Sequence, residues 1–220
     1  MNIQKRYIFS PETKGIVMHR MIWAYDLGCY LVGMGVRFRH QTLQLAQLHA
    51  GEHVLDVGCG TGVMTRLAAE QVGNDGEVTG IDPSEEMIQV AKEKAVKEHS
   101  KANFQLGVIE SLPFDDESFD IVLSSMMLHH LPPELKVTGL REIFRVLKPA
   151  GRLMVVDVDK PTSLTGRMLM FPWRNDPALK ANLEGHVTEL IQNAGFLNVH
   201  HPLPRWRGFI SFWLAFKPVI

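Results

Sequence analysis

The stretch that decides the fold is His53-Val-Leu-Asp-Val-Gly-Cys-Gly-Thr-Gly-Val63. It reads as a short buried strand that runs into a glycine-rich turn, with a helical pattern beginning at Val63. Glycines let the backbone approach a ligand closely, and the first N–H groups of the helix have no partner within the helix. The stretch therefore predicts a nucleotide site in an α/β protein.

The rest of the chain repeats this alternation of strand and helix, which is typical of βαβ units around a parallel sheet. Strands are predicted at 54–57, 78–81 (ending at Asp82), 103–106, 119–124, 152–158, 196–200 and 209–216. Helices are predicted at 63–72, after the N-cap Ser84, at 132–147 and at 186–194. The segment 148–151 (Lys-Pro-Ala-Gly) is expected to end the third of these helices.

Length and composition indicate one domain over residues 1–220, because 220 residues with 45% hydrophobic content are enough for one substantial core. Residues 1–50 form a predicted helical N-terminal extension, and residues 159–184 form an insert expected to cover the substrate. The net charge of −1 gives no sign of a nucleic-acid partner. Cys29 and Cys59 have no zinc-like spacing, so no metal site is expected and both are read as reduced.

No signal peptide follows Met1, and no apolar run reaches the roughly 20 residues of a spanning helix. A cytoplasmic location is expected, and a peripheral contact with a membrane is left open. The C-terminal segment 206–217 is read as a core hairpin strand rather than a membrane anchor. The sequence gives no indication of the oligomeric state.

The spacing of the glycines indicates which nucleotide the turn accepts. A dinucleotide fingerprint, Gly-x-Gly-x-x-Gly, would require glycine at position 63, which is Val63. The pattern is instead Asp-x-Gly-x-Gly-x-Gly, from Asp56 to Gly62. A carboxylate at Asp56 suits an ammonium or sulfonium group and gains nothing from a pyrophosphate, while Asp82 suits a ribose diol.

Four segments in order resemble the class I S-adenosylmethionine-dependent methyltransferases. They are Val54-Leu-Asp-Val-Gly-Cys-Gly-Thr-Gly62, Val78-Thr-Gly-Ile-Asp82, Ser111-Leu-Pro-Phe-Asp-Asp-Glu-Ser-Phe-Asp120 and Leu140-Arg-Glu-Ile-Phe-Arg-Val-Leu-Lys-Pro-Ala-Gly-Arg-Leu153. The resemblance implies a Rossmann-like, seven-stranded, mostly parallel sheet of order 3-2-1-4-5-7-6 with strand 7 antiparallel and helices on both faces. It implies S-adenosylmethionine as cofactor, S-adenosylhomocysteine as product and a small-molecule methyl acceptor.

The resemblance also implies a role for each matching residue. Gly58, Gly60 and Gly62 would pass under the methionine part of the cofactor, and Asp56 would face its ammonium. Asp82 would take the ribose hydroxyls, and Met87 would pack near the adenine. The predicted cofactor-binding set is completed by Cys59, Thr61, Pro83, Val108, Ile109, Glu110, Ser124 and Ser125.

One departure from the family pattern concerns the adenine. The pair before Glu110 normally begins with an acid that accepts from the adenine amino group, but here the pair is Val108-Ile109. Either a backbone group replaces that acid or Glu110 does, and the alternative reading of Glu110 is an exposed loop acid. One missing charge-assisted hydrogen bond costs about 1.5–3 kcal/mol.

The segment Ser124-Ser-Met-Met-Leu-His-His130 would border the transferred methyl group. His129 is the candidate catalytic residue, because a histidine can accept a proton near neutral pH. The alternative is that His129 and His130 only orient the loop through hydrogen bonds. Methyl transfer itself needs mainly an in-line nucleophile and a dry site.

A narrower resemblance concerns the acceptor. Tyr25-Asp26, the stretch Gly35-Val-Arg-Phe-Arg39 and the stretch Val156-Asp-Val-Asp-Lys-Pro161 are similar to the ubiquinone/menaquinone C-methyltransferases and related phospholipid N-methyltransferases. The quinone enzymes carry Arg-Asn where this chain has His129-His130. A quinone- or lipid-like acceptor and a soluble metabolite therefore both stay open.

Two groups of apolar side chains are candidates for the acceptor pocket, with helix packing as the alternative. They are Met18, Met21, Ile22, Trp23 and Tyr25 in the extension, and Met168, Met170, Phe171 and Trp173 in the insert. Two other functions are weighed: an NAD-dependent oxidoreductase, which lacks its glycine spacing here, and a non-catalytic cofactor-binding protein, which only the Val108-Ile109 departure favours.

Overall fold

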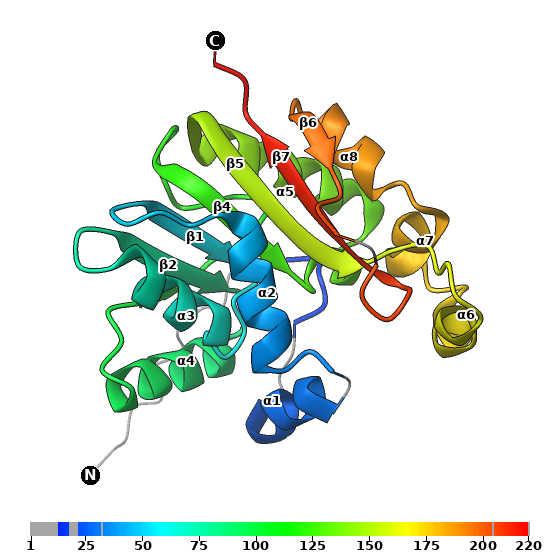
Figure 1. Ribbon diagram of the computed structural model, residues 1–220, viewed down its shortest axis with the longest axis horizontal. Helices are drawn as coiled ribbons and strands as arrows, with labels where there is room; N and C mark the ends of the chain where they lie inside the picture. Colours follow the sequence, from blue (N-terminus) through cyan, green and yellow to red (C-terminus); the bar gives the residue numbers. More distant parts are fainter. Residues whose placement is uncertain (1–12, 18–21, 32, 204, 220) are drawn as a thin grey trace, which may run out of the picture.

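A computed structural model describes residues 13–17, 22–31, 33–203 and 205–219; of residues 22–25 it describes the backbone alone. Within these ranges one sheet contains seven strands in the order β3-β2-β1-β4-β5-β7-β6 (Figure 1). The strands are β1 (His53–Val57), β2 (Glu77–Asp82), β3 (Asn103–Leu106), β4 (Phe119–Ser125), β5 (Leu147–Val158), β6 (Leu197–His200) and β7 (Ile210–Phe216). β1 to β5 are parallel, and β7 is antiparallel to both of its neighbours. The predicted strand order is confirmed.

Helices cover both faces of the sheet (Figure 1). On one face lie α2 (Val36–Ala46), α3 (Val63–Val72) and α4 (Glu85–Lys97), and on the other lie α5 (Pro133–Val146) and α8 (Val187–Asn193). The helices α2 and α3 bury Phe38, Leu43, Met64 and Ala68 against the sheet, and α5 and α8 bury Leu140, Ile143, Val187 and Ile191. α4 begins at the predicted N-cap Ser84, whose hydroxyl accepts from the Met87 N–H.

The last strand, β7, is buried on both faces, as the core reading of the C-terminal segment predicted. Phe212 and Leu214 pack into the cluster under α2 and α3, whereas Trp213 and Ala215 pack into the cluster under α5 and α8. Among the described residues, no helix has both the length and the apolar content that a membrane span needs.

The start of β5 differs from its predicted position. The strand begins at Leu147 rather than at residue 152, and residues 148–151 belong to it instead of forming only a turn. Phe119 pairs with Leu147 and Ile121 pairs with Arg152, so the extra residues of β5 bulge out between these pairs. Ala150 takes up the bend with a φ of 60°.

The extension and the insert add the remaining elements. The extension contains α1 (Ile22–Leu31) and α2, and its residues 13–17 are irregular. The insert contains α6 (Leu164–Met170), the 3₁₀ turn η2 (Phe171–Trp173) and α7 (Pro177–Glu184), beyond the carboxyl end of β5 (Figure 1). Met18, Met21 and the side chains of Ile22, Trp23 and Tyr25 lie outside the described residues.

Arg152 of β5 fastens α2 to the sheet. Its guanidinium donates to both carboxylate oxygens of Glu52, at 2.7 and 2.8 Å, and to the carbonyls of Ala46 and Gln47 at the end of α2. Burial would raise the pKa of Glu52, but Arg152 holds it below its ordinary value. α2 therefore lies on the sheet through a nearly buried, bidentate ion pair.

Replacing Arg152 by alanine should lower the free energy of unfolding by about 3 kcal/mol, because Glu52 and two carbonyls lose their partner inside the protein. Urea titration followed by circular dichroism measures this loss. Lys148→Ala is the matched control, since it removes an exposed ion pair with Asp120 and should cost less than about 1 kcal/mol. Equal losses in the two variants would contradict the anchoring role.

Candidate active site

The glycine turn after β1 is held in shape by the end of β2. The N–H groups of Gly58 and Cys59 both donate to the Ile81 carbonyl at 2.9 Å. The N–H of Gly60 donates to the Asp82 carboxylate at 3.0 Å. Gly58 has a φ of 75°, and a Cβ at this position would lie 2.4 Å from the Met127 side chain. Only glycine fits there, which explains the first glycine of the pattern.

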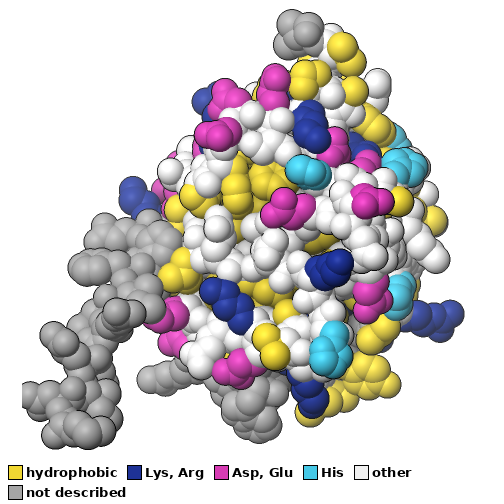
Figure 2. All heavy atoms as spheres, turned by 90° about the vertical axis from the view of Figure 1, so that its left-hand side faces the viewer, with side chains coloured by type: hydrophobic (Ala, Val, Ile, Leu, Met, Phe, Trp, Pro, Cys, Tyr) yellow, Lys and Arg dark blue, Asp and Glu magenta, His cyan; other side chains and the backbone are white. Residues whose placement is uncertain are grey.

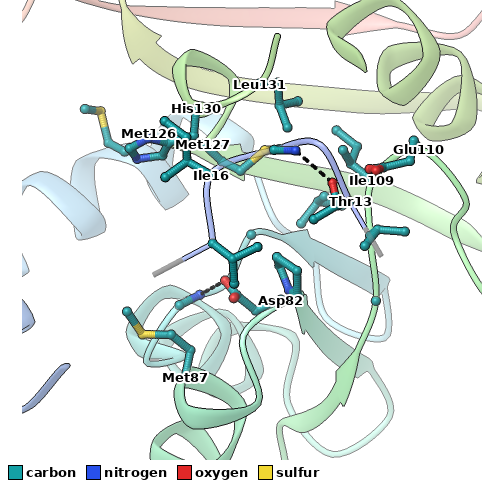
Figure 3. Close-up of a pocket in the computed structure, with 18 residues that line it drawn as sticks. Thr13, Ile16, Asp82, Met87, Ile109, Glu110, Met126, Met127, His130 and Leu131 are labelled. Atoms are coloured by element: carbon teal, nitrogen blue, oxygen red, sulfur yellow. Dashed lines mark hydrogen bonds between the residues drawn. The ribbon is translucent and has the colours of Figure 1, made fainter. Parts of the chain in front are cut away.

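Two hollows meet at this turn, and both are lined by Gly58, Gly60 and Met126. The first lies over the ends of β1, β2 and β4 (Figure 3). It is lined further by Thr13, Gly15, Ile16, Val17, Val57, Asp82, Pro83, Met87, Gly107, Val108, Ile109, Glu110, Met127, His130 and Leu131. The second is lined further by Cys29, Met34, Phe38, Arg39, Asp56, Cys59, Thr61, Val63, Met64 and Ser125.

Asp82 borders the first hollow as a preorganised acceptor. One of its oxygens accepts from the Ser84 N–H at 2.9 Å and the other from the Gly60 N–H at 3.0 Å. Burial raises the pKa of Asp82 above its ordinary value, although these two N–H groups act in the opposite direction. Each carboxylate oxygen has a further lone pair, so the pair can still accept from a diol. The arrangement fits the ribose predicted for Asp82.

Glu110 presents an unpartnered oxygen to the same hollow. Its Oε2 is buried and has no hydrogen-bond partner within the described residues. A buried acceptor without a donor costs about 1–3 kcal/mol, which a ligand N–H would recover. The neighbouring Val108 and Ile109 are buried apolar wall, and Met87 lies on the adjoining side (Figure 3). A flat heterocycle with an exocyclic amino group fits here, and the reading of Glu110 as an exposed loop acid is wrong.

Asp56 borders the second hollow and is 2% exposed. Burial raises the pKa of Asp56 to about 6, against the effect of the Thr65 hydroxyl, which donates to Asp56 at 2.7 Å. A cation placed beside this carboxylate would restore its charged form. Arg39 of α2 lines the same hollow with a largely buried side chain, so the cavity offers a carboxylate to the ammonium and a guanidinium to the carboxylate of an amino-acid group.

The sequence did not single out Arg39 as a site residue, nor Asp26 of α1. Asp26 accepts from the Thr61 hydroxyl at 2.7 Å, pairs with Lys94 of α4 and lies 4.0 Å from Arg39. Burial opposes its ionisation, but Lys94 holds the pKa of Asp26 below its ordinary value. Asp26 and Arg39 both lie in the stretches that resemble the quinone enzymes, and that was the available signal. The extension thereby forms one wall of the site.

The chain turns sharply at the end of β4, where Met126 has a φ of 54°. This turn leads into η1 (Leu128–His130), which places the two histidines on different sides. His130 lines the first hollow, whereas His129 lines neither of the two hollows. The His129 Nδ1 lies 2.6 Å from one carboxylate oxygen of Asp157 in β5. The backbone N–H of His129 donates to the other oxygen at 3.3 Å.

The two rings differ in their surroundings, since His129 contacts Asp157 and His130 lines the first hollow. Burial, together with His129 at a ring distance of 4.0 Å, lowers the pKa of His130 to about 4. Burial would raise the pKa of Asp157, but His129 holds it below its ordinary value. The loop-orienting alternative therefore suits His129, and the pocket-facing, neutral imidazole is that of His130.

Residues 13–17 lie across the mouth of the first hollow (Figure 3). The Ile16 N–H donates to the His130 carbonyl at 3.2 Å, and a Cβ on Gly15 would lie 3.0 Å from the Leu131 side chain. The segment thus covers the hollow from the side opposite the glycine turn.

Most of the predicted site residues are brought together around the two hollows, and three are not. Gly62 supports the turn from outside, since a Cβ there would lie 2.5 Å from Phe104. Ser124 lines neither hollow, and its buried hydroxyl has no partner within the described residues. His129 is directed at Asp157, as described above.

The sheet order with its antiparallel β7, and the Asp-x-Gly-x-Gly-x-Gly turn beside Asp82, define the class I methyltransferase type of Rossmann-like fold. A family model described as a methyltransferase domain matches residues 48–195. A solved S-adenosylmethionine-dependent methyltransferase from Aquifex aeolicus superposes with a TM-score of 0.66 at 24% identity, covering 83% of this chain and 89% of its own.

Two curated relatives are similar in sequence. A demethylmenaquinone methyltransferase of Listeria welshimeri is 43% identical over 57% of this chain, and the match spans only about half (53%) of that relative. A demethylmenaquinone methyltransferase of Anoxybacillus flavithermus is 31% identical over 83% of this chain and 85% of the relative. The chain belongs to the class I S-adenosylmethionine-dependent methyltransferase family.

The raised pKa of Asp56 makes cofactor binding dependent on pH. The ammonium of S-adenosylhomocysteine requires a charged Asp56, so below pH 6 binding must first release a proton. The affinity should therefore fall as pH decreases below 6, approaching about tenfold per pH unit. Calorimetric titration between pH 5 and pH 8 measures this slope.

The Asp56→Asn variant should bind S-adenosylhomocysteine more weakly than the wild type, and its affinity should no longer change with pH between pH 5 and pH 8. Asp120→Asn alters an exposed carboxylate at the other end of the strands and should keep the pH dependence of the wild type. A wild-type affinity that is constant across this range would contradict the raised pKa.

Glu110→Gln should weaken binding of S-adenosylhomocysteine by about 10- to 100-fold, because a charged acceptor for the adenine amino group is lost. S-inosylhomocysteine, in which a carbonyl oxygen replaces that amino group, should lose no affinity in the variant, because the Gln amide can donate to this oxygen. If Glu110→Gln weakened both ligands to the same extent, Glu110 would not contact the amino group.

Proposed function

We propose that the chain transfers the methyl group of S-adenosylmethionine to a ring carbon of a reduced, quinone-like acceptor. The observation that carries this proposal is the similarity to a demethylmenaquinone methyltransferase over 83% of the chain. The apolar wall of the first hollow, formed by Met126, Met127, Leu131 and Ile16, supports it because such a wall suits a flat, apolar ring. A cytoplasmic location is part of the same proposal.

In this proposal the cofactor occupies the second hollow and the part of the first hollow beside Asp82 and Glu110, and the acceptor lies against the apolar wall of the first hollow. Asp56 and Arg39 hold the amino-acid group, Asp82 holds the ribose, and Glu110 and Met87 hold the adenine. Cys59, Thr61, Ser125, Pro83, Val108 and Ile109 complete the walls around it. When bound, S-adenosylmethionine supplies a methyl carbon that the positively charged sulfur makes electrophilic.

The protein's own contribution is to place the acceptor carbon in line with the methyl group and to exclude water. As the new carbon–carbon bond forms, the carbon–sulfur bond breaks and its electron pair stays on sulfur. The hydroxyl proton of the acceptor leaves to activate the ring, the proton on the methylated carbon then leaves to restore aromaticity, and the oxygen regains a proton, so that one proton is released overall. We assign the role of proton acceptor to His130, whose neutral imidazole lines the hollow, while the Asp157–His129 pair positions its loop.

A second candidate acceptor is a small soluble metabolite. The observation that favours it is the His129-His130 pair in place of the Arg-Asn pair of the quinone enzymes. Membership of the methyltransferase family, by contrast, supports neither the oxidoreductase nor the non-catalytic reading.

The proposal is tested by incubating the chain with S-adenosylmethionine labelled on its methyl group and a reduced, short-chain demethylated naphthoquinol. Mass spectrometry and NMR should find the label on a ring carbon of the quinol and none on the oxidised quinone. His130→Gln should lower kcat by about 10²- to 10³-fold with little change in KM, because a proton acceptor is removed.

His186→Gln, which alters an exposed histidine on the insert side of α8, should leave kcat unchanged. Label on a hydroxyl oxygen, or transfer only to a soluble amine such as phosphoethanolamine, would overturn the proposed acceptor. An unchanged kcat in His130→Gln would overturn the role of His130.

A further inference from the structure

The insert after β5 displays a concentration of large apolar side chains to solvent. In α6 and η2, Leu164, Met168, Leu169, Phe171 and Trp173 are each between 50% and 76% exposed. α6 and η2 follow each other without a break, and together they project beyond the sheet (Figure 1). Exposed apolar groups that gather in this way mark an interaction surface rather than ordinary surface variation. We call these five side chains the insert patch.

The position of α6 is fixed by contacts on the side of the helix that faces the protein, opposite the patch. The Thr162 N–H donates to the Gly208 carbonyl at 2.9 Å, and the Ser163 hydroxyl caps the helix by accepting from Gly166. Gly166 is buried so close to Gly208 that a Cβ on it would lie 3.1 Å from the Gly208 carbonyl. α6 thus contacts the rest of the protein through Gly166, and its large side chains face the solvent.

Cationic residues lie on both sides of the patch in the sequence. Residues 160–180 contain Lys160, Arg167, Arg174 and Lys180 but one acid, Asp176, in a chain whose net charge is −1. All four cationic side chains are exposed, and none forms an ion pair with a described carboxylate. The Arg174 guanidinium lies 3.8 Å from the centre of the Phe171 ring. Aromatic rings flanked by arginine and lysine suit the boundary between lipid tails and headgroups.

Charge is distributed differently on the opposite side of the molecule. There, acidic and basic side chains are interspersed (Figure 2). A second copy of the chain would bring the four cations of one patch against those of the other, which disfavours self-association through this surface. An anionic lipid surface offers both an apolar layer and a complementary charge.

We propose that the insert patch and its four cations dock the protein on the surface of an anionic phospholipid membrane. Docking here would bring the acceptor site close to the lipid. α7 follows the patch and packs against η1, which carries His130. Lys136 of α5 holds α7 in place by donating to the Ala178 carbonyl and the Asn182 side chain. The reason for docking, access to a lipid-soluble acceptor, rests on the proposed function, whereas the binding itself does not.

The test measures co-sedimentation of the full chain with vesicles of equal parts phosphatidylglycerol and phosphatidylcholine, and with vesicles of phosphatidylcholine alone. The protein should bind the anionic vesicles, and its Trp173 fluorescence should be quenched by brominated lipid, a signal that Trp173→Phe removes. The double variant Arg167→Gln/Met168→Ser should bind the anionic vesicles at least about tenfold more weakly.

The matched control is Val96→Ser/Lys97→Gln, which changes an equally exposed apolar residue and its cationic neighbour on α4. This control should bind vesicles like the wild type. Thermal unfolding of all variants, together with methyl transfer to a short-chain acceptor, separates lost docking from lost folding.

Three results would overturn the docking surface. They are no binding of wild type to anionic vesicles, equal binding by the patch and control variants, and a dimer that the patch variant alone dissolves. Vesicle binding without any methyl transfer would leave docking standing and would count against the proposed function instead. The docking surface is supported if the wild type binds anionic vesicles and Arg167→Gln/Met168→Ser selectively loses this binding.

Discussion

The site depends on one constraint: the end of β2 holds the glycine turn that follows β1. The Ile81 carbonyl accepts two N–H groups of the turn, and the Asp82 carboxylate accepts a third. Because parallel pairing sets Val57 opposite Ile81, the turn cannot move without breaking the register of β1 and β2. The same carboxylate faces the first hollow, so the group that shapes the turn is also the group available to a ribose.

The N-terminal extension supplies the walls of the site that the sheet does not form. Asp26 ties α1 to the turn through Thr61, Arg39 brings a guanidinium to the hollow that contains Asp56, and residues 13–17 cross the other hollow. The walls of the site therefore come from segments far apart in sequence. The ion pair of Arg152 with Glu52, together with the buried Phe38 and Leu43, fixes α2 and hence Arg39 on the sheet.

Strand periodicity and glycine spacing were enough to predict the strands and the positions of Asp56 and Asp82, whereas the order of the sheet was implied by the resemblance to the class I methyltransferases. The same pattern underlies the S-adenosylmethionine-dependent methyltransferase class, which family membership confirms. It could not distinguish His129 from His130, because the positive φ of Met126 decides which ring enters the hollow. Nor could it decide the role of Glu110, which depends on burial, or find Asp26, whose partner Thr61 is 35 residues away.

The central claim is that the two hollows form one S-adenosylmethionine site. A crystal structure of the chain with S-adenosylhomocysteine tests it most directly. We expect the adenine amino group at hydrogen-bond distance from Glu110, the ribose hydroxyls on Asp82 and the ammonium beside Asp56. A ligand bound outside the two hollows, or one bound with Glu110 and Asp56 turned away from it, would contradict the account.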